Sequence, residues 1–229
     1  MYDFNSDLQA WRKYTLRVHS RRFAKNDFYT SCLTYVEGKG HSTIARADCD
    51  RSKVLEIGTG GGEHIPYESA ETLKDYTAAD VRQDFLDLVK KQFPEISTHL
   101  VNGIRLPFAD GSFTTCIAHA VLEHVSTLDE TLAEVSRVLS SRGSFLVVVP
   151  TNGSLCVNLF KLALSYLTLR ANGIARPSYI WNFENVNNLS RVRALLHKHP
   201  DIQIQRALPF RFLPAQLSPL FFFHCRKRS

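Results

Sequence analysis

Short apolar runs alternate with amphipathic stretches through the middle of the chain. Five runs have the length of buried strands, at residues 54–57, 76–80, 98–101, 113–118 and 144–149. Between them, residues 84–93 and 128–139 carry apolar side chains at helical spacing, and we expect Asp84 to cap the first helix. Strands that alternate with helices predict a parallel sheet with helices on both faces and a ligand site at the carboxyl ends of the strands.

The two ends of the chain follow other patterns. Residues 1–53 are mostly helical in pattern, with irregularly spaced apolar positions. Residues 155–169 are apolar nearly all round, which favours a largely buried, packed helix; a lid over the ligand site and a helix in a membrane interface are the alternatives. Residues 185–198 fit a basic amphipathic helix. Residues 202–207 and 220–225 fit two final strands, which a short loop can join as an antiparallel pair.

The composition is that of a globular protein, with 44% hydrophobic and 22% charged residues. The sequence has no long uncharged apolar run and no basic start followed by an apolar stretch, which predicts a cytoplasmic location rather than secretion or a membrane span. The five cysteines are scattered and form no Cys-x-x-Cys pair. We therefore expect reduced thiols, and neither disulfides nor a zinc site.

The net charge of +6 is unevenly distributed along the chain. Residues 1–53 carry +4, residues 54–169 carry −6 and residues 170–229 carry +8. Basic surface attracts phosphate, acidic sugars, nucleic acid or anionic lipid, although ordinary solvated lysine and arginine give the same count. The basic residues at 226–228 would add about 1 kcal/mol each at an anionic lipid surface, which allows peripheral membrane contact.

A glycine-rich stretch follows the first predicted strand. Residues 56–62 read Glu-Ile-Gly-Thr-Gly-Gly-Gly, and we expect a helix after them. A dinucleotide-binding loop would have a sixth-place glycine where this chain has Glu63, and a carboxylate there disfavours a bound diphosphate. Asp80, at the end of the second predicted strand, is placed to accept hydrogen bonds from two ribose hydroxyls.

Together these stretches resemble the class I S-adenosylmethionine-dependent methyltransferases, within the broad group that has a Leu-Pro-Phe segment before strand four. The matching stretches are residues 54–62, Asp80, and residues 106–113, 121–125 and 134–143. The resemblance covers about residues 50–150. It implies an α/β, Rossmann-like seven-stranded sheet, mostly parallel with an antiparallel last strand and with helices on both faces.

The resemblance also implies roles for individual residues in holding S-adenosylmethionine. Gly58, Gly60 and Gly62 would line its methionine part, Glu56 would support the loop, and Asp80 would hold the ribose. Asn102 stands where the family often has an aspartate near the adenine amino group, and an amide oxygen can accept the same hydrogen bond. The family's Phe-Asp at the entry to strand four is Phe113-Thr114 here.

His119, at the end of the fourth predicted strand, is the candidate catalytic residue. Methyl transfer needs an acceptor held close to the methyl group, and a base only if the acceptor must lose a proton. Imidazole titrates near neutral pH, so His119 is either this base or a wall of the cofactor site. Some relatives bind a metal through Glu-x-x-Glu-His, but the first position here is Ala120, so we expect no metal and a structural role for His124.

Aromatic and basic residues after the fifth strand are the candidate acceptor site. They are Tyr179, Trp181, Asn182 and Arg176. We expect O-methylation of a small-molecule, glycan or lipid-linked acceptor, which an arginine-lined site suits if it is anionic. The alternatives are an RNA or nucleotide methyltransferase, for which no recognition module or long arginine–aromatic tract is found, and an inactive cofactor-binding scaffold that serves a partner.

The length of 229 residues suits one methyltransferase domain. We divide it into a helical cap (1–50), a cofactor-binding core (51–150), a lid with acceptor-binding helices (151–200) and a strand pair (201–229). Neither the acceptor nor the oligomeric state follows from the sequence.

Overall fold

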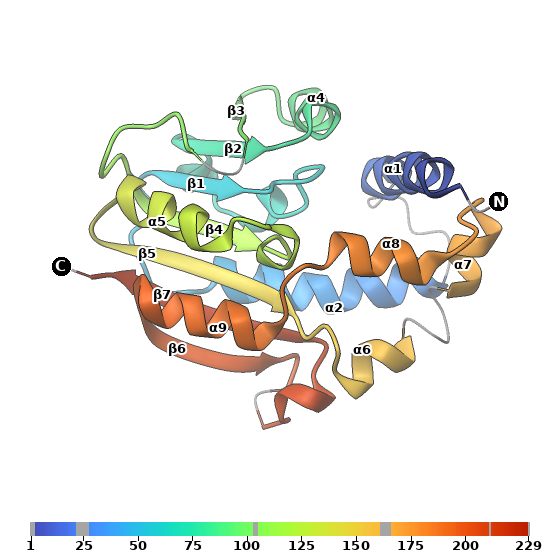
Figure 1. Cartoon of the computed structure of the whole chain (residues 1–229). Coiled ribbons are helices and arrows are strands. Elements are labelled where there is room, and N and C mark those ends of the chain that lie inside the picture. The colour runs from blue at the N-terminus through green and yellow to red at the C-terminus, as the bar shows by residue number, and fades with distance from the viewer. Residues whose placement is uncertain (1–2, 22–27, 103–104, 161–165, 211, 229) are drawn as a thin grey trace.

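Seven strands form one mixed sheet in the computed structural model, which describes residues 3–21, 28–102, 105–160, 166–210 and 212–228. The spatial order is β3-β2-β1-β4-β5-β7-β6 (Figure 1). The strands are β1 (Val54–Ile57), β2 (Tyr76–Asp80), β3 (Ser97–Leu100), β4 (Phe113–His119), β5 (Leu139–Pro150), β6 (Pro200–Leu208) and β7 (Leu220–Lys227). Only β7 runs antiparallel to its neighbours, β5 and β6, among these strands. The predicted sheet, with its antiparallel last strand, is confirmed.

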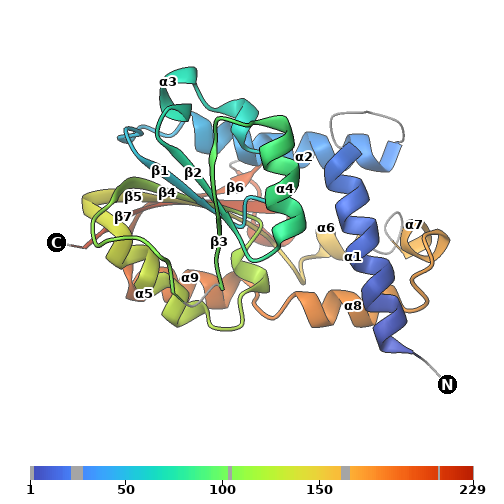
Figure 2. The ribbon, with the colours of Figure 1, turned by 90° about the horizontal axis from the view of Figure 1, so that it is seen from above.

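Helices cover both faces of the sheet. The α-helices are α1 (Phe4–Arg21), α2 (Phe28–Ala45), α3 (Ala70–Leu73), α4 (Gln83–Gln92), α5 (Leu128–Val138), α6 (Leu155–Phe160), α7 (Tyr166–Ala171), α8 (Pro177–Glu184) and α9 (Leu189–Lys198). Helices α2 and α4 pack on one face, while α5 and α9 pack on the other (Figure 2). Helix α1 lies outside these layers and contacts α4 and α8.

The core has two halves, one on each face of the sheet. Along β5, Phe145 and Val147 point to the α5 side, while Leu146 and Val148 point to the α2 side, and all four are fully buried. Full burial of one such side chain contributes about 1.5–3 kcal/mol. Because parallel strands covered on both faces bury every side chain, they appear in the sequence as continuous apolar runs. This is why β1, β4 and β5 were predictable.

The expectation that Asp84 caps a helix was wrong. Helix α4 begins at Gln83 with Arg82 in the capping position, and no side chain accepts a capping hydrogen bond there. Asp84 lies in the first turn, where it accepts hydrogen bonds from the Arg82 guanidinium at 3.0 and 2.6 Å. The carboxylate predicted to cap the helix is therefore one residue inside it, and it forms an ion pair with Arg82 instead.

The prediction of a buried helix over residues 155–169 was also wrong. Two short helices, α6 and α7, occupy the described part of this stretch; residues 161–165 lie outside the described residues. Leu155, Leu159 and Leu167 are 58%, 56% and 68% exposed, and of the residues in this stretch whose burial is described only Leu169 is buried. Apolar side chains of this stretch lie at the surface because α6 and α7 lie beyond the end of the sheet (Figure 1). No described helix is long and apolar enough to cross a membrane.

Arg137 on α5 anchors the Leu-Pro-Phe segment that precedes β4. Its guanidinium donates to the backbone oxygens of Leu106 at 3.0 Å and Phe108 at 2.8 Å. The same group pairs with Glu134, whose carboxylate also accepts from the Leu106 backbone N–H at 3.0 Å. Two stretches that carry the family resemblance are therefore parts of one hydrogen-bonded unit, which fixes the entry to β4.

This unit makes stability depend on pH. Hydrogen bonds from Arg137 lower the pKa of Glu134 from 4.5 to about 2. The stabilisation is therefore present above about pH 4.5 and is lost as the pH falls towards 2. We expect Glu134→Gln to lower the free energy of unfolding at pH 7 by about 1 kcal/mol. Solvent screening keeps this loss small because the carboxylate is partly exposed. Urea denaturation of both proteins across this pH range should show the difference shrinking with acid.

The matched control is Glu71→Gln, because that carboxylate is 82% exposed and pairs only with Lys74 in the described structure. It should change stability by less than about 0.5 kcal/mol at any pH. Equal losses in the two variants would contradict the assigned role of Glu134.

Candidate functional site

The glycine loop after β1 lies at the carboxyl end of the sheet, where α1, α6, α7 and α8 gather (Figure 1). Gly58, Gly60 and Gly62 have φ angles of +66°, +55° and +86°, a region that other residues enter at a cost of about 1–2 kcal/mol. The backbone N–H groups of Gly58 and Thr59 both donate to the Ala79 oxygen, at 2.7 and 3.2 Å. The loop is thereby tied to the end of β2.

The helix expected directly after this loop is absent from the described residues that follow it. The chain instead makes turns and a short 3-10 segment, η1 (Ile65–Tyr67), before the four-residue α3, which Ser69 caps. Successive glycines disfavour a helix, and Pro66 can enter one only at its first turn. The expected helix dipole at Glu63 therefore does not arise.

Asp80 joins the loops that follow β1 and β2. Its two carboxylate oxygens accept hydrogen bonds from the backbone N–H of Gly60 at 3.0 Å and of Arg82 at 2.9 Å. The side chain is buried, and this burial raises the pKa of Asp80, although both backbone hydrogen bonds oppose the rise. A carboxylate has about four acceptor positions, so Asp80 can still accept from a ligand.

Glu56 supports the loop from beneath. It is buried in β1 and accepts hydrogen bonds from the Thr59 hydroxyl at 2.6 Å and the Tyr76 hydroxyl at 2.9 Å. Burial raises the pKa of Glu56, while nearby His64 lowers it. Glu56 therefore links β1 to Thr59 in the glycine loop and to Tyr76 at the start of β2.

Helix α1 closes over the glycine loop. His19 pairs with Glu63, and its imidazole lies beside Phe85 with ring centroids 4.6 Å apart. Thr15, one turn earlier, accepts a hydrogen bond from Arg82 at 3.0 Å. These contacts place an N-terminal helix beside the glycine loop, within the segment predicted as a helical cap.

His119 ends β4 on the face covered by α2. Its ring stacks on His41 with centroids 3.8 Å apart and an interplanar angle of 17°. This approach needs Gly40, because a Cβ there would overlap Nε2 of His119. Ala120, the next residue, has φ +53°, a strained conformation for a residue with a side chain.

A buried polar chain continues from His41. Its Nδ1 lies 3.3 Å from Nδ1 of His64, and Nε2 of His64 lies 2.8 Å from a carboxylate oxygen of Glu68. Glu68 also pairs with Arg51 at 2.6 Å. Because the carboxylate can only accept, Nε2 of His64 carries a proton and donates a hydrogen bond to Glu68. His41 comes from α2 and His64 and Glu68 from the segment after the glycine loop, so no single sequence motif holds the cluster.

The other expected cofactor residue, Asn102, is exposed just beyond β3. Its side-chain oxygen accepts a hydrogen bond from the Arg105 backbone N–H at 3.1 Å. The backbone N–H of Val101 donates to the backbone oxygen of Asp80 at 2.9 Å. Asn102, the next residue, therefore lies near the end of β2.

Some of the expected acceptor residues are exposed at the surface, and one packs against other apolar side chains. Tyr179, Asn182 and Arg176 are exposed on or beside α8, where the Arg176 guanidinium lies 5.4 Å from the Tyr179 ring centroid. Trp181 instead packs against α1 in a third apolar cluster. Asp7 of α1 locks this arrangement by accepting backbone hydrogen bonds from Ala175 and Arg176, at 2.6 and 2.8 Å.

His124 connects the loop after β4 to the end of α8. Its Nδ1 donates to the Glu184 backbone oxygen at 2.7 Å. The neighbouring Glu123 is buried, and its backbone oxygen accepts from Val186 and Asn187. This geometry fits the structural role expected for His124. Among the described residues, no group of three or more His, Cys, Asp or Glu side chains is arranged to hold a metal ion.

The donor set suits a cationic nucleoside better than a dinucleotide. Three carboxylates, on Glu56, Glu63 and Asp80, surround the glycine loop. They would repel a diphosphate and attract a sulfonium or an ammonium group. Acceptor oxygens on Asp80 also suit ribose hydroxyls. The residues present therefore fit S-adenosylmethionine.

Comparison with known proteins agrees with this geometry. Residues 55–147 match a family model described as a methyltransferase domain. A protein of Schizosaccharomyces pombe described as uncharacterized methyltransferase C25B8.09 is 29% identical over 99 residues, which cover 43% of this chain and 39% of that protein. The fatty-acid O-methyltransferase of Mycolicibacterium smegmatis is 33% identical over 110 residues, with 46% and 40% covered. The chain thus matches well under half the length of these relatives.

A solved chain in the Haloferax volcanii complex of the Trm112 methyltransferase activator has a similar fold. It matches over 100% of both chains with a TM-score of 0.65 and 12% identity. Residues 55–147 of this chain therefore match a methyltransferase domain, and the chain shares the fold of that solved structure.

The glycine loop can be tested by adding one methyl group. Gly58→Ala would incur the positive-φ cost and would also overlap Val121, which adds about 1–3 kcal/mol. Gly153→Ala is the matched control, because Gly153 has φ +89° but no atom within 4 Å of the added methyl. We expect Gly58→Ala to lose more unfolding free energy than Gly153→Ala in urea denaturation. Equal losses would contradict the close packing of Gly58.

Proposed function

We propose that this chain is an O-methyltransferase that transfers the methyl group of S-adenosylmethionine to a hydroxyl of a lipid-linked acceptor. The class I domain at residues 55–147 supports the methyl transfer. The exposed apolar side chains of α6 and α7 support a lipid-linked acceptor.

The donor side of the reaction rests on the glycine loop and Asp80. When bound, S-adenosylmethionine supplies an electrophilic methyl group on a positively charged sulfur. In our proposal Asp80 holds the ribose hydroxyls, Gly58, Gly60 and Gly62 allow the backbone to approach the methionine part, and the nearby carboxylates favour positive charge.

His119 would serve as the base on the acceptor side. A new C–O bond forms as the C–S bond breaks, and the hydroxyl proton must go to a base. Nε2 of His119 is buried beneath α2, and in our proposal the imidazole at the end of β4 takes that proton. The stack on His41 would hold the ring in place at the end of β4.

The apolar lid would receive the acceptor's lipid part. Leu155 and Leu159 on α6 and Leu167 on α7 are each more than half exposed. Basic side chains, among them Arg170 and Arg176, accompany them. Apolar groups beside cations suit a molecule with an apolar tail and an anionic head. The fatty-acid O-methyltransferase among the relatives also acts on a lipid.

Cofactor binding can be tested by calorimetric titration with S-adenosylmethionine. Asp80→Asn keeps the shape of the side chain but removes its charge and one acceptor oxygen, so we expect binding at least about tenfold weaker, equivalent to about 1.4 kcal/mol. Asp87→Asn is the control, because Asp87 is exposed on the outer side of α4. Absence of binding by the folded wild-type protein would contradict the proposed activity.

The acceptor class can be tested with methyl-labelled S-adenosylmethionine and an extract of cells that express the protein. We expect label in the organic phase, and much less of it with Leu159→Gln/Leu167→Gln. Ile204→Gln, an exposed apolar residue on β6, is the control. His119→Asn should keep cofactor binding but lose transfer. Label confined to the aqueous phase, or to RNA, would contradict a lipid-linked acceptor.

A further inference from the structure

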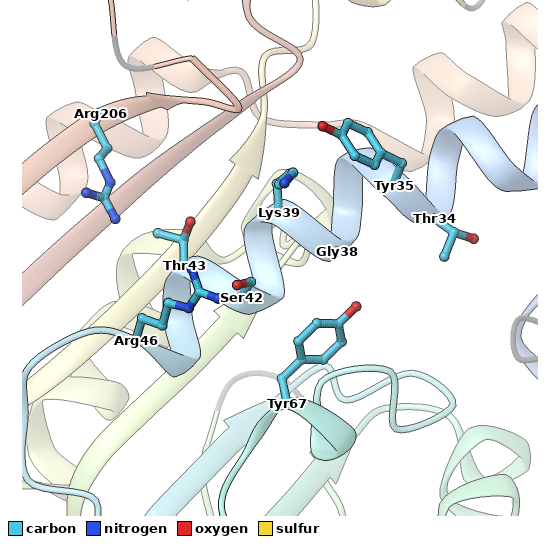
Figure 3. Close-up of a pocket in the computed structure, with 9 residues that line it drawn as sticks. All are labelled: Thr34, Tyr35, Gly38, Lys39, Ser42, Thr43, Arg46, Tyr67 and Arg206. Atoms are coloured by element: carbon cyan, nitrogen blue, oxygen red, sulfur yellow. The ribbon is translucent and has the colours of Figure 1, made fainter.

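A groove of about 550 Å³ runs along the outer side of α2, away from the glycine loop (Figure 3). Four of its lining residues, Tyr35, Lys39, Ser42 and Arg46, recur at helical spacing and so form one stripe of α2. Tyr67 of η1 and Arg206 of β6 form the opposite walls. We call this cavity the α2 groove.

The α2 groove is separate from the methyl-transfer site. Successive residues of a helix are about 100° apart, so Gly40 lies about 200° from both Gly38 and Ser42. Gly40 faces His119 on the inner side of α2, whereas Gly38 and Ser42 line the groove on the outer side. The ring of Tyr67, stacked on His41 with centroids 5.2 Å apart, stands between the two sites.

The chemistry of the α2 groove is that of an anion site. Three cationic side chains line it, and none of the nine described lining residues is acidic. Among the described residues, neither Lys39 nor Arg46 forms an ion pair. Lys39 instead lies 5.0 Å from the Tyr35 ring centroid, and Arg206 lies over Phe222. Like charges brought together repel one another, and a bound anion would relieve that repulsion.

Hydroxyl groups complete the lining. Thr34, Ser42, Thr43 and Tyr67 each bring an O–H that can donate a hydrogen bond. Arginine guanidinium groups match the oxygen geometry of phosphate, and hydroxyls satisfy its remaining acceptor positions. The volume falls in the range of small-molecule sites and exceeds the needs of a phosphate group alone. We propose that the α2 groove binds a phosphate-bearing ligand at a second site, distinct from that of methyl transfer.

The proposal can be tested by calorimetric titration of the full chain with glycerol 3-phosphate, without S-adenosylmethionine. We expect saturable one-to-one binding that Lys39→Gln/Arg46→Gln weakens at least about tenfold. Lys53→Gln/Lys91→Gln removes the same charge from exposed positions outside the groove and should leave the affinity unchanged. Thermal unfolding of each variant checks that it remains folded.

A second arm identifies the source of the phosphate. Phosphatidylcholine vesicles that contain phosphatidic acid replace glycerol 3-phosphate in a sedimentation assay. Binding to vesicles alone, lost only in the groove variant, assigns a lipid headgroup; binding to glycerol 3-phosphate assigns a soluble ligand. Absence of binding in both arms, or equal weakening in both double variants, would overturn the proposal. Asp80→Asn should still bind phosphate, so failure at one site is distinguishable from failure at the other.

Discussion

The site depends on one buried carboxylate that joins two loops. Asp80 accepts backbone hydrogen bonds from Gly60 and Arg82, and thereby holds the loops after β1 and β2 in a fixed relation. Burial of a charge is unfavourable unless hydrogen bonds compensate, and these two bonds partly offset the rise that burial causes in the pKa of Asp80. Gly60, which has a left-handed backbone with φ +55°, donates its N–H to this carboxylate, so the glycine and the acid form one structural unit.

The two N-terminal helices contribute side chains to the region at the carboxyl end of the sheet. Helix α2 lies directly on β4, β5 and β7, and it brings His41 against His119 because Gly40 has no side chain. Helix α1 lies farther out and reaches the glycine loop through His19 and the lid through Asp7. Helix α1 therefore contacts both the glycine loop and the segment that leads into α8.

Elements that depend on local sequence could be predicted, whereas features that depend on tertiary packing were missed. Strands buried on both faces were evident as apolar runs, and the resemblance identified Asp80 and the glycines. Residues 155–169 were misjudged because apolarity does not say whether a helix packs on the core or extends beyond it. His41 on α2 meets the neighbouring pair of His64 and Glu68 only in the folded chain. The helical stripe from Lys39 to Arg46 lines a cavity because the fold places Arg206 opposite it, and the sequence alone did not indicate this placement.

The distribution of charge matters more than its net value. Several basic residues of the C-terminal region are engaged within the protein: Lys198 pairs with Asp129, Arg228 pairs with Asp201, and Arg193 lies 4.9 Å from the Phe221 ring centroid. The count of +8 for residues 170–229 therefore overstates the positive surface there. Lys39 and Arg46, from a less basic part of the chain, face a cavity instead. Acidic groups surround the glycine loop and basic groups line the α2 groove, so local fields would direct a cationic donor and an anionic ligand to different sides of α2.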